Sequence, residues 1–281
     1  MLNIGIDMGG TNIRGGLLFE KNLQRIISKK INAEGSVEEV LEELFLLTDQ
    51  IITSRVKSIG IGVPGLVDVK NGIVHDVVYI PSWKEVPLQK LMQDRYHVPV
   101  FINNDANCFA LGEYYFGQDK QIKNMIGLTI GTGLGTGLIL NKKLYSGRNG
   151  GAGEFGMIDY LDHCYEYYAA GQFFKNVYQV SGELVFEAAK KGNVAALKMY
   201  EEMGAHLGKF IKLLLYAVDP DLIILGGSVR HAWPFFKAAM WKQIETFAFK
   251  KSVILLKIQI SELENSGVLG AAFLGYDLKI D

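Results

Sequence analysis

The stretch that decides the fold is residues 2–12, LNIGIDMGGTN. Leu2, Ile4 and Ile6 alternate with polar or small residues, as in a half-buried strand, and a glycine-rich turn leads into a second apolar run at 13–18. We therefore expect a β-hairpin whose first strand ends in Asp7. Such a turn can cradle a phosphate, with Asp7 holding Mg²⁺ or its waters, but an ordinary hairpin turn explains the glycines equally well.

The rest of the chain alternates predicted strands with predicted helices. Ser36 and Glu39 form a capping box ahead of apolar residues at helical spacing, which continue to Ile51. A long loop is expected between Gly65 and Pro87. Strands are expected at 58–63, 98–103 and 222–225, helices after Pro87, at 106–116 and over most of the segment up to Val218, and a strand followed by a helix from Val253. This alternation predicts an α/β fold.

Length, composition and charge bound the class of protein. The chain has 281 residues, of which 49% are hydrophobic and 21% charged, enough for about two domains with separate cores. Its 29 Lys and Arg against 30 Asp and Glu leave a net charge of −1, which gives no help in binding nucleic acid. The apolar run at 211–218 is too short to span a membrane and is expected in a core helix.

Compartment and domain boundary are read from weaker signals. Cys108 and Cys164 cannot form a disulfide framework, and no signal peptide is visible at the N-terminus, so we expect a cytoplasmic protein with reduced thiols. No linker marks a boundary, and we place it at Phe116-Gly117. This gives a smaller α/β domain at 1–116, completed by a C-terminal helix at about 268–281, and a larger α/β domain at 117–267.

Two further glycine-rich turns follow predicted strands. Gly131-Thr132-Gly133-Leu134-Gly135 splits a strand-turn-strand unit at 125–140 that echoes the N-terminal hairpin and indicates an internal duplication. Gly226-Gly227-Ser228 separates a strand from a helix. The 131–135 turn lacks the Gly-Lys-Ser/Thr of a Walker A motif, and it leads to a strand where a dinucleotide fingerprint would lead to a helix. Each alone is a weak signal, but three such turns together favour phosphate binding over simple chain reversal.

Asn104 and Asp105 lie where a predicted strand ends and a helix begins. Ligands bind at this position in open α/β sheets. Asp is also a favoured helix N-cap, and the sequence favours that structural explanation of Asp105 taken alone. The two roles are compatible, because a helix N-terminus keeps a carboxylate ionised, as a general base must be to accept a hydroxyl proton during attack on phosphorus.

Polar residues farther along the chain suit a polyol ligand. Glu154 is flanked by Gly153 and Gly156, and carboxylates such as Glu154 and Glu166 can orient vicinal hydroxyls. For Glu166 alone, a solvated position on a helix is the more favoured explanation. The five histidines show no metal-ligand spacing, so no metal centre is expected from them. The aromatic residues at 165–174 are expected in core packing, with one edge open to stacking on a sugar.

The order of these motifs resembles the ROK family of repressors, open reading frames and sugar kinases. The similarity runs over nearly the whole chain, to Gly267-Val268-Leu269-Gly270-Ala271-Ala272, and the motifs in series are specific. It implies the actin-like ATPase fold, which belongs to the ribonuclease H-like group, with two α/β domains and a cleft between them in which ATP and sugar meet. It also implies ATP with Mg²⁺ as cofactors, a hexose or hexose derivative as substrate and a possible homodimer.

The resemblance also implies roles for single residues. Asp105 would be the general base and Asp7 would organise Mg²⁺. The positions that match sugar-binding residues are Gly65, Asn104, Asp105, Glu154, Met157 and Glu166. Those that match the ATP site are Asp7, Gly9, Gly10, Thr11, Asn12, Gly131, Thr132, Gly133, Gly226, Gly227 and Ser228.

One departure from the family pattern concerns Met157. Many members carry His there, which binds both sugar and a structural zinc, followed by a cysteine-rich loop. Here that loop contains only Cys164, so we expect a zinc-free variant. Methionine cannot hydrogen-bond a sugar hydroxyl as His can, which leaves glucose, allose, N-acetylmannosamine and β-glucosides open as substrates.

Three hypotheses about function follow. The first is an ATP-dependent kinase in which Asp105 deprotonates a hexose hydroxyl, on C6 in the leading version. The second is a non-catalytic sugar-binding regulator or sensor of the same family. Family repressors carry a DNA-binding segment ahead of the first strand, for which the six residues before Asp7 leave no room. The third is a degenerate kinase that binds ligands without turnover.

Overall fold

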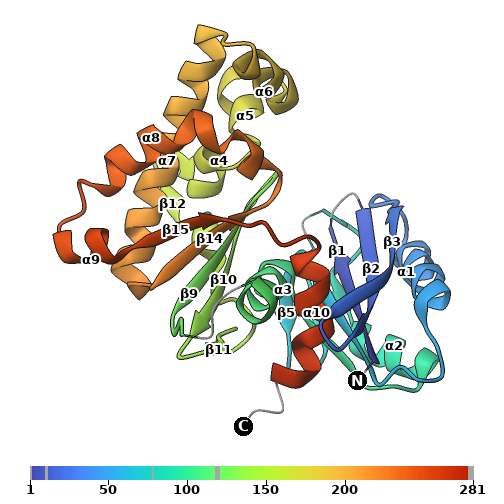
Figure 1. Ribbon diagram of the computed structural model, residues 1–281. Helices are drawn as coiled ribbons and strands as arrows, with labels where there is room; N and C mark the ends of the chain where they lie inside the picture. Colours follow the sequence, from blue (N-terminus) through green and yellow to red (C-terminus); the bar gives the residue numbers. More distant parts are fainter. Residues whose placement is uncertain (1, 10–11, 78, 118–120, 278–281) are drawn as a thin grey trace. The chain divides into compact units, whose positions relative to one another are not determined.

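The computed structural model describes residues 2–9, 12–77, 79–117 and 121–277 (Figure 1). Contacts within the chain divide it into two compact units. The first comprises Met1–Gln121, Gly137–Ala152 and Glu262–Asp281, and the second comprises Ile122–Thr136 and Gly153–Ser261. The chain therefore passes between the units more than once, which the sequence pattern did not indicate for residues 137–152.

The first unit is built on a five-stranded sheet. The strands are β1 (Leu2–Met8), β2 (Asn12–Phe19), β3 (Asn22–Lys30), β4 (Ser58–Val63) and β8 (Val100–Asn104), in the order β3-β2-β1-β4-β8. The predicted hairpin is confirmed, since β1 and β2 pair antiparallel from Leu2↔Phe19 to Met8↔Ile13. Strands β1, β4 and β8 are parallel, so their carboxyl ends meet at one edge of the sheet.

Helices of the first unit cover this sheet. They are α1 (Val37–Ile51), α2 (Leu88–Tyr96), α3 (Asp105–Gly112) with a π-helical turn at Glu113–Gly117, and α10 (Ser266–Asp277). The capping box of α1 is confirmed, with both Ser36–Glu39 hydrogen bonds present. Figure 1 shows α10 lying along α3, and α10 also packs on β1 and β4, where glycines allow its close approach. A Cβ on Gly60 would lie 1.7 Å from the Ala271 carbonyl oxygen, and one on Gly5 2.0 Å from that of Val268.

Two sequence expectations need correction. The segment between Gly65 and Pro87 is no simple loop but holds a three-stranded sheet of β5 (Leu66–Asp68), β6 (Ile73–His75) and β7 (Glu85–Val86). Strands of two or three residues are too short to show a period. Val253, where a strand was expected, lies in α9 (Lys250–Leu255), and the strand β15 comes later, at Lys257–Ile260.

The second unit contains most of a mixed sheet and a layer of helices. The sheet order is β11-β10-β9-β14-β15, and the boundary between units passes through β10, so β11 and the end of β10 belong to the first unit. Its strands are β9 (Met125–Ile130), β10 (Leu134–Leu140), β11 (Lys143–Leu144), β14 (Leu222–Gly226) and β15; β12 (Asp159–Tyr160) and β13 (His163–Cys164) form a separate pair. The helices are α4 (Tyr165–Ala169), α5 (Phe173–Tyr178), α6 (Gly182–Lys190), α7 (Val194–Val218), α8 (Trp233–Ile244) and α9. Strand β14 runs parallel to both β9 and β15, which again brings strand ends to one edge.

The long helix α7 carries the apolar run expected in a core helix, and Leu214 and Leu215 on it are buried. It packs on α8 through Gly204 and Gly208, where a Cβ would meet backbone carbonyls of α8 at 2.5 and 2.4 Å. Within the described residues, no helix combines the length and apolar character needed to cross a membrane.

Candidate functional site

One row of residues crosses the three parallel strands of the first unit at their carboxyl ends. Asp7 of β1 is in register with Gly62 of β4, and Gly62 is in register with Asn103 of β8. Neighbouring strands lie about 4.8 Å apart. Asp7 and Asn103 are two strands apart, so the distance between their backbones across the sheet is roughly 10 Å. Asn104 and Asp105 follow directly, so the structure brings Asp7 and Asp105 to the same edge of the sheet.

The Asp7 carboxyl group is partly buried, and its surroundings oppose its charge. Desolvation by burial raises its pKa from 3.8 to about 6, while the charge of Arg14 acts in the opposite direction. The first turn of α10 comes close, since a Cβ on Gly267 would lie 2.7 Å from Asp7 Oδ2. Burial and then the charges of Asp7 and Asp105 raise the pKa of the Cys108 thiol, which places this thiol near both carboxylates.

The turn after Asp7 is closed by a hydrogen bond from the Gly9 amide to the Asn12 carbonyl oxygen, at 2.9 Å. Asn12 is exposed at the start of β2. The predicted phosphate contacts Gly10 and Thr11 lie outside the described residues. The hairpin turn is therefore present, and the roles of its four residues stay predictions.

The cap of α3 is Asn104 and not Asp105, which corrects the structural explanation offered for Asp105. Asn104 Oδ1 accepts hydrogen bonds from the Ala106 and Asn107 amides at 2.8 and 3.3 Å. Its Nδ2 donates to the Gly65 carbonyl oxygen at 3.2 Å, so two predicted sugar-binding positions are joined. Asp105 occupies the first helical position, with Oδ1 accepting from the Ala106 amide at 2.9 Å.

The buried side-chain amides of Asn103 and Asn107, next to Asn104, were not predicted as part of the site. Asn103 Oδ1 accepts from the Asn104 amide and from Asn107 Nδ2, both at 2.9 Å. Asn103 Nδ2 donates to Ser146 Oγ at 3.3 Å. The sequence signal for this pair was two asparagines four positions apart, at 103 and 107. Their hydrogen bonds fix the direction in which α3 leaves the sheet.

In the second unit, two of the predicted glycine turns converge. The 131–133 turn follows β9 and the 226–228 turn follows β14, whose ends are neighbours through Gly226↔Thr129. Gly227 has φ 78°, and a Cβ there would lie 2.3 Å from the Ile130 carbonyl oxygen. Gly171 joins them, because its amide donates to the Gly131 carbonyl oxygen at 2.7 Å. Gly171 was not predicted as a site residue, because no local motif marks it.

Glu166 is not a solvated surface residue, contrary to the favoured expectation for it alone. It lies on α4 and is partly buried. Its Oε2 accepts from the Leu134 amide at 2.8 Å and its Oε1 accepts from Gln172 Nε2 at 3.2 Å. Glu166 therefore ties α4 to the end of the 131–133 turn.

Glu154 begins a 3₁₀ turn at Glu154–Met157 that lies against β10. The flanking glycines explain how: a Cβ on Gly153 would lie 2.1 Å from the Thr136 carbonyl oxygen, and one on Gly156 2.5 Å from that of Leu134. Glu154 is exposed, yet desolvation and then the charge of Glu166 raise its pKa. Met157 is 60% exposed. The two carboxylates and Met157 thus lie on one face of the second unit.

The aromatic residues at 165–174 pack largely as expected. Phe173 and Phe174 are buried, and Tyr165 stacks on Tyr160 with ring centroids 4.2 Å apart. Cys108 and Cys164 are both free. Among the described residues, no group of three or more His, Cys, Asp or Glu side chains is arranged to hold a metal ion.

Comparison with known proteins gives consistent results. The profile of the ROK family matches residues 3–277. A glucokinase of Thermotoga maritima is 28% identical over 96% of this chain and 95% of its own length. A xylose repressor of Caldicellulosiruptor bescii is 27% identical over 95% of this chain and 75% of its own length.

Among solved structures, a ROK family glucokinase from Streptomyces griseus, crystallised with glucose and AMPPNP, superposes with a TM-score of 0.84 at 27% identity. The match covers 98% of this chain and 99% of that one. The fold expected from the sequence, the α/β actin-like ATPase fold, is therefore confirmed.

Proposed function

The chain belongs to the ROK family, and on that basis we propose that it is an ATP-dependent sugar kinase that phosphorylates a hexose hydroxyl. The hydroxyl on C6 is the first candidate for the acceptor. The observation that carries the proposal is the placement of Asp105. It follows β8 directly, beside a cap residue that holds Gly65, and shares a sheet edge with Asp7. The glucokinases among the relatives support the same reaction class.

Asp105 is the proposed general base. Its position in the first turn of α3 favours the ionised form through the helix dipole and a backbone amide. An ionised carboxylate can accept the hydroxyl proton as the oxygen attacks the γ-phosphorus of ATP. In such transfers, positioning and charge stabilisation supply most of the catalysis, so the rigid hydrogen bonds around Asn104 matter as much as the base.

The sugar contacts are proposed at Gly65, Asn104, Glu154, Met157 and Glu166. A hydroxyl-rich ligand needs directional acceptors and donors, which Glu154 and Asn104 offer. The hydrogen bonds that Glu166 makes to Leu134 and Gln172 give it a positioning role as well. The exposed thioether of Met157 offers no strong hydrogen bond, which favours a substrate with an apolar or missing group at that point.

The ATP phosphates are proposed to bind at the glycine turns: Gly9, Gly10, Thr11 and Asn12 in the first unit, and Gly131, Thr132 and Gly133 in the second. Gly226, Gly227 and Ser228 would lie near the adenosine. The support is local geometry. Gly227 has a positive φ of 78°, a backbone conformation that glycine-rich anion-binding turns use.

Magnesium would be held with ATP near Asp7. Proteins usually bind Mg²⁺ through one or two carboxylates, with phosphate oxygens and waters as the other ligands, and the single Asp7 carboxylate fits that donor set. When bound, the ion neutralises part of the charge on the phosphates. Asp7 itself would orient the waters of the ion.

A non-catalytic regulator is the second candidate, because the relatives include a xylose repressor. Sugar binding without turnover would favour it. A cytoplasmic location and a homodimer remain predictions for either candidate.

Turnover is the measurement that tests the proposal. Purified protein is assayed for ADP release with Mg-ATP against glucose, allose, mannose, fructose, N-acetylmannosamine, N-acetylglucosamine and β-glucosides. We expect sugar-dependent ADP release that Asp105→Asn abolishes, while calorimetry still detects sugar binding by that variant. Asp94→Asn, a carboxylate exposed on α2, is the matched control and should keep full activity. Sugar binding with no ADP release from the wild-type protein would refute the kinase.

A further inference from the structure

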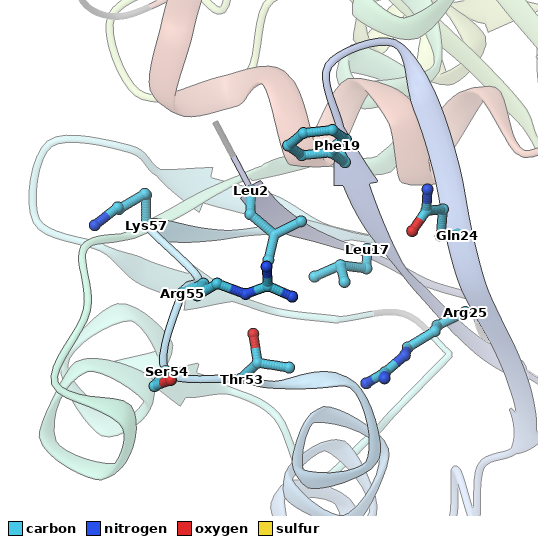
Figure 2. Close-up of a pocket in the computed structure, with 9 residues that line it drawn as sticks. All are labelled: Leu2, Leu17, Phe19, Gln24, Arg25, Thr53, Ser54, Arg55 and Lys57. Atoms are coloured by element: carbon cyan, nitrogen blue, oxygen red, sulfur yellow. The ribbon is translucent and has the colours of Figure 1, made fainter.

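A pocket in the first unit lies at the end of the sheet opposite Asp7. Its volume is about 650 Å³, within the range of small-molecule sites. The lining residues, drawn in Figure 2, are Leu2, Leu17, Phe19, Gln24, Arg25, Thr53, Ser54, Arg55 and Lys57. Leu2 opens β1, and its carbonyl oxygen accepts from the Lys57 amide at 2.8 Å. Asp7 lies five positions farther along β1, or roughly 17 Å of strand away.

The charge of this pocket is one-sided. Three of its nine lining residues are cationic and none is acidic. Three other cations of the unit stand beside carboxylates, in the Lys84–Asp76, Lys90–Asp94 and Arg95–Asp49 pairs. Within the described part of the chain, Arg25, Arg55 and Lys57 enter no such ion pair. On a protein with a net charge of −1, unpaired cations gathered around a cavity indicate an anionic ligand.

The polar groups converge on one space. Figure 2 shows the Arg55 guanidinium group and the Thr53 hydroxyl turned toward the region between Leu17 and Thr53, and the Arg25 guanidinium group reaching from β3 toward Thr53. Thr53 Oγ1 is buried and makes no hydrogen bond. A buried hydroxyl without a partner is costly, and a ligand oxygen would satisfy it. The Lys57 amine points away from this space in Figure 2, so it contributes charge at the rim.

A β-bulge aims Arg25 into the pocket. Between Gly15↔Ile27 and Leu17↔Gln24, the two residues Arg25 and Ile26 of β3 face the single residue Gly16 of β2. Arg25 has φ 50°, a left-handed conformation that glycine adopts more easily than any L residue. Bulges redirect side chains, and strain of this kind is retained where the side chain serves a function. Here it turns a guanidinium toward the cavity.

Part of the lining is apolar. Leu2, Leu17 and Phe19 line the pocket together with the cations, and Phe19 is 45% exposed. Two guanidinium groups with a hydroxyl match the several oxygens of a phosphate better than the two of a carboxylate. We infer that this pocket binds a small phosphate ester whose organic part is apolar or aromatic, at a site separate from the proposed kinase centre.

Calorimetry on the full chain tests the inference, with phenyl phosphate as the probe and neither ATP nor sugar present. Arg55→Gln and Arg25→Gly should each weaken binding about tenfold, since each removes a charge-assisted hydrogen bond. Arg25→Gly relieves the left-handed backbone, so its melting temperature should not fall, which separates lost binding from lost folding. Thr53→Val should weaken binding several-fold by removing the hydroxyl.

The matched control is a lysine outside the pocket. Lys70→Gln, exposed in the turn after β5, should change the affinity by less than about twofold. Methyl phosphate should bind more weakly than phenyl phosphate because it lacks the ring. Equal binding of phenyl phosphate by the wild type and both arginine variants would overturn the site. Tighter binding of benzoate would overturn the phosphate class. Either failure leaves the kinase proposal untouched.

Discussion

Replacing Asp7 by asparagine should make the ligand-free protein more stable at neutral pH. The folded chain holds this carboxyl in a partly buried place near the first turn of α10, where burial raises its pKa to about 6. An acid whose pKa is higher in the folded state binds its proton more tightly there than in the unfolded chain. The tighter binding of this proton therefore stabilises the folded chain fully at low pH, and this stabilisation is lost as the pH rises toward 6 and beyond.

The size of the effect follows from the two pKa values. A rise from 3.8 to about 6 at roughly 1.4 kcal/mol per pH unit gives a cost of about 3 kcal/mol once Asp7 is ionised in both states. By the same relation, the cost is about 1.5 kcal/mol at pH 5 and reaches its plateau above about pH 7. The asparagine side chain of the variant does not ionise and carries no such cost at any pH. Other titrating groups, Glu154 among them, are shared by both proteins and cancel in the difference.

Urea unfolding of the wild type and Asp7→Asn at several pH values between 5 and 8, without Mg²⁺ or nucleotide, measures this difference. We expect the variant to be the more stable protein, with a gain that about doubles from pH 5 to pH 8. Asp94→Asn, which removes an exposed carboxylate, should show a small difference that does not change with pH. A pH-independent difference for Asp7→Asn, or a variant less stable than the wild type at pH 8, would refute the reasoning.

Three further predictions concern single contacts. Ser36→Ala should lower the free energy of unfolding by about 1 kcal/mol, because it removes the capping box of α1; an unchanged urea midpoint would contradict this. Glu166→Gln should weaken ATP binding about tenfold and hexose binding less, since it loosens the 131–133 turn; calorimetry with each ligand decides, and a loss confined to hexose would assign Glu166 to the sugar alone. Gly227→Ala should cost at least about 2 kcal/mol in thermal unfolding, because its φ is 78° and a Cβ would meet the backbone of Ile130; a melting temperature equal to that of the wild type would count against the packing.

Structural features that depend on residues close together in the chain were predicted from the sequence. The β1-β2 hairpin follows from alternation around a glycine turn, and the start of α1 follows from the Ser36–Glu39 pattern, because both depend on neighbours within a few residues. The strand ends that carry Asp7 and Asp105 were found for the same reason. The predicted N-cap of α3 was wrong by one residue, because Asn104 and Asp105 are both good caps and only the backbone conformation decides between them.

Features that depend on distant contacts were missed. Glu166 was expected at the surface because its partner Leu134 is 32 residues away in the chain. The short strands β5, β6 and β7 carry too few residues for a period. The bulge at Arg25 has no signal in β3 itself, since the usual marker of a left-handed bulge residue is glycine, and here the chain has arginine.

The close packing of α10 on bare backbone has a consequence for biosynthesis. Gly5 and Gly60 of β1 and β4 face carbonyl oxygens of Val268 and Ala271, so at these two positions the helix itself covers the strands. A ribosome releases residues 153–261, nearly all of the second unit, before it releases this helix. Domains generally fold as units during synthesis, with N-terminal parts first. In this chain the unit that begins first is completed last, so its sheet lacks the cover of α10 until the inserted unit has been synthesised.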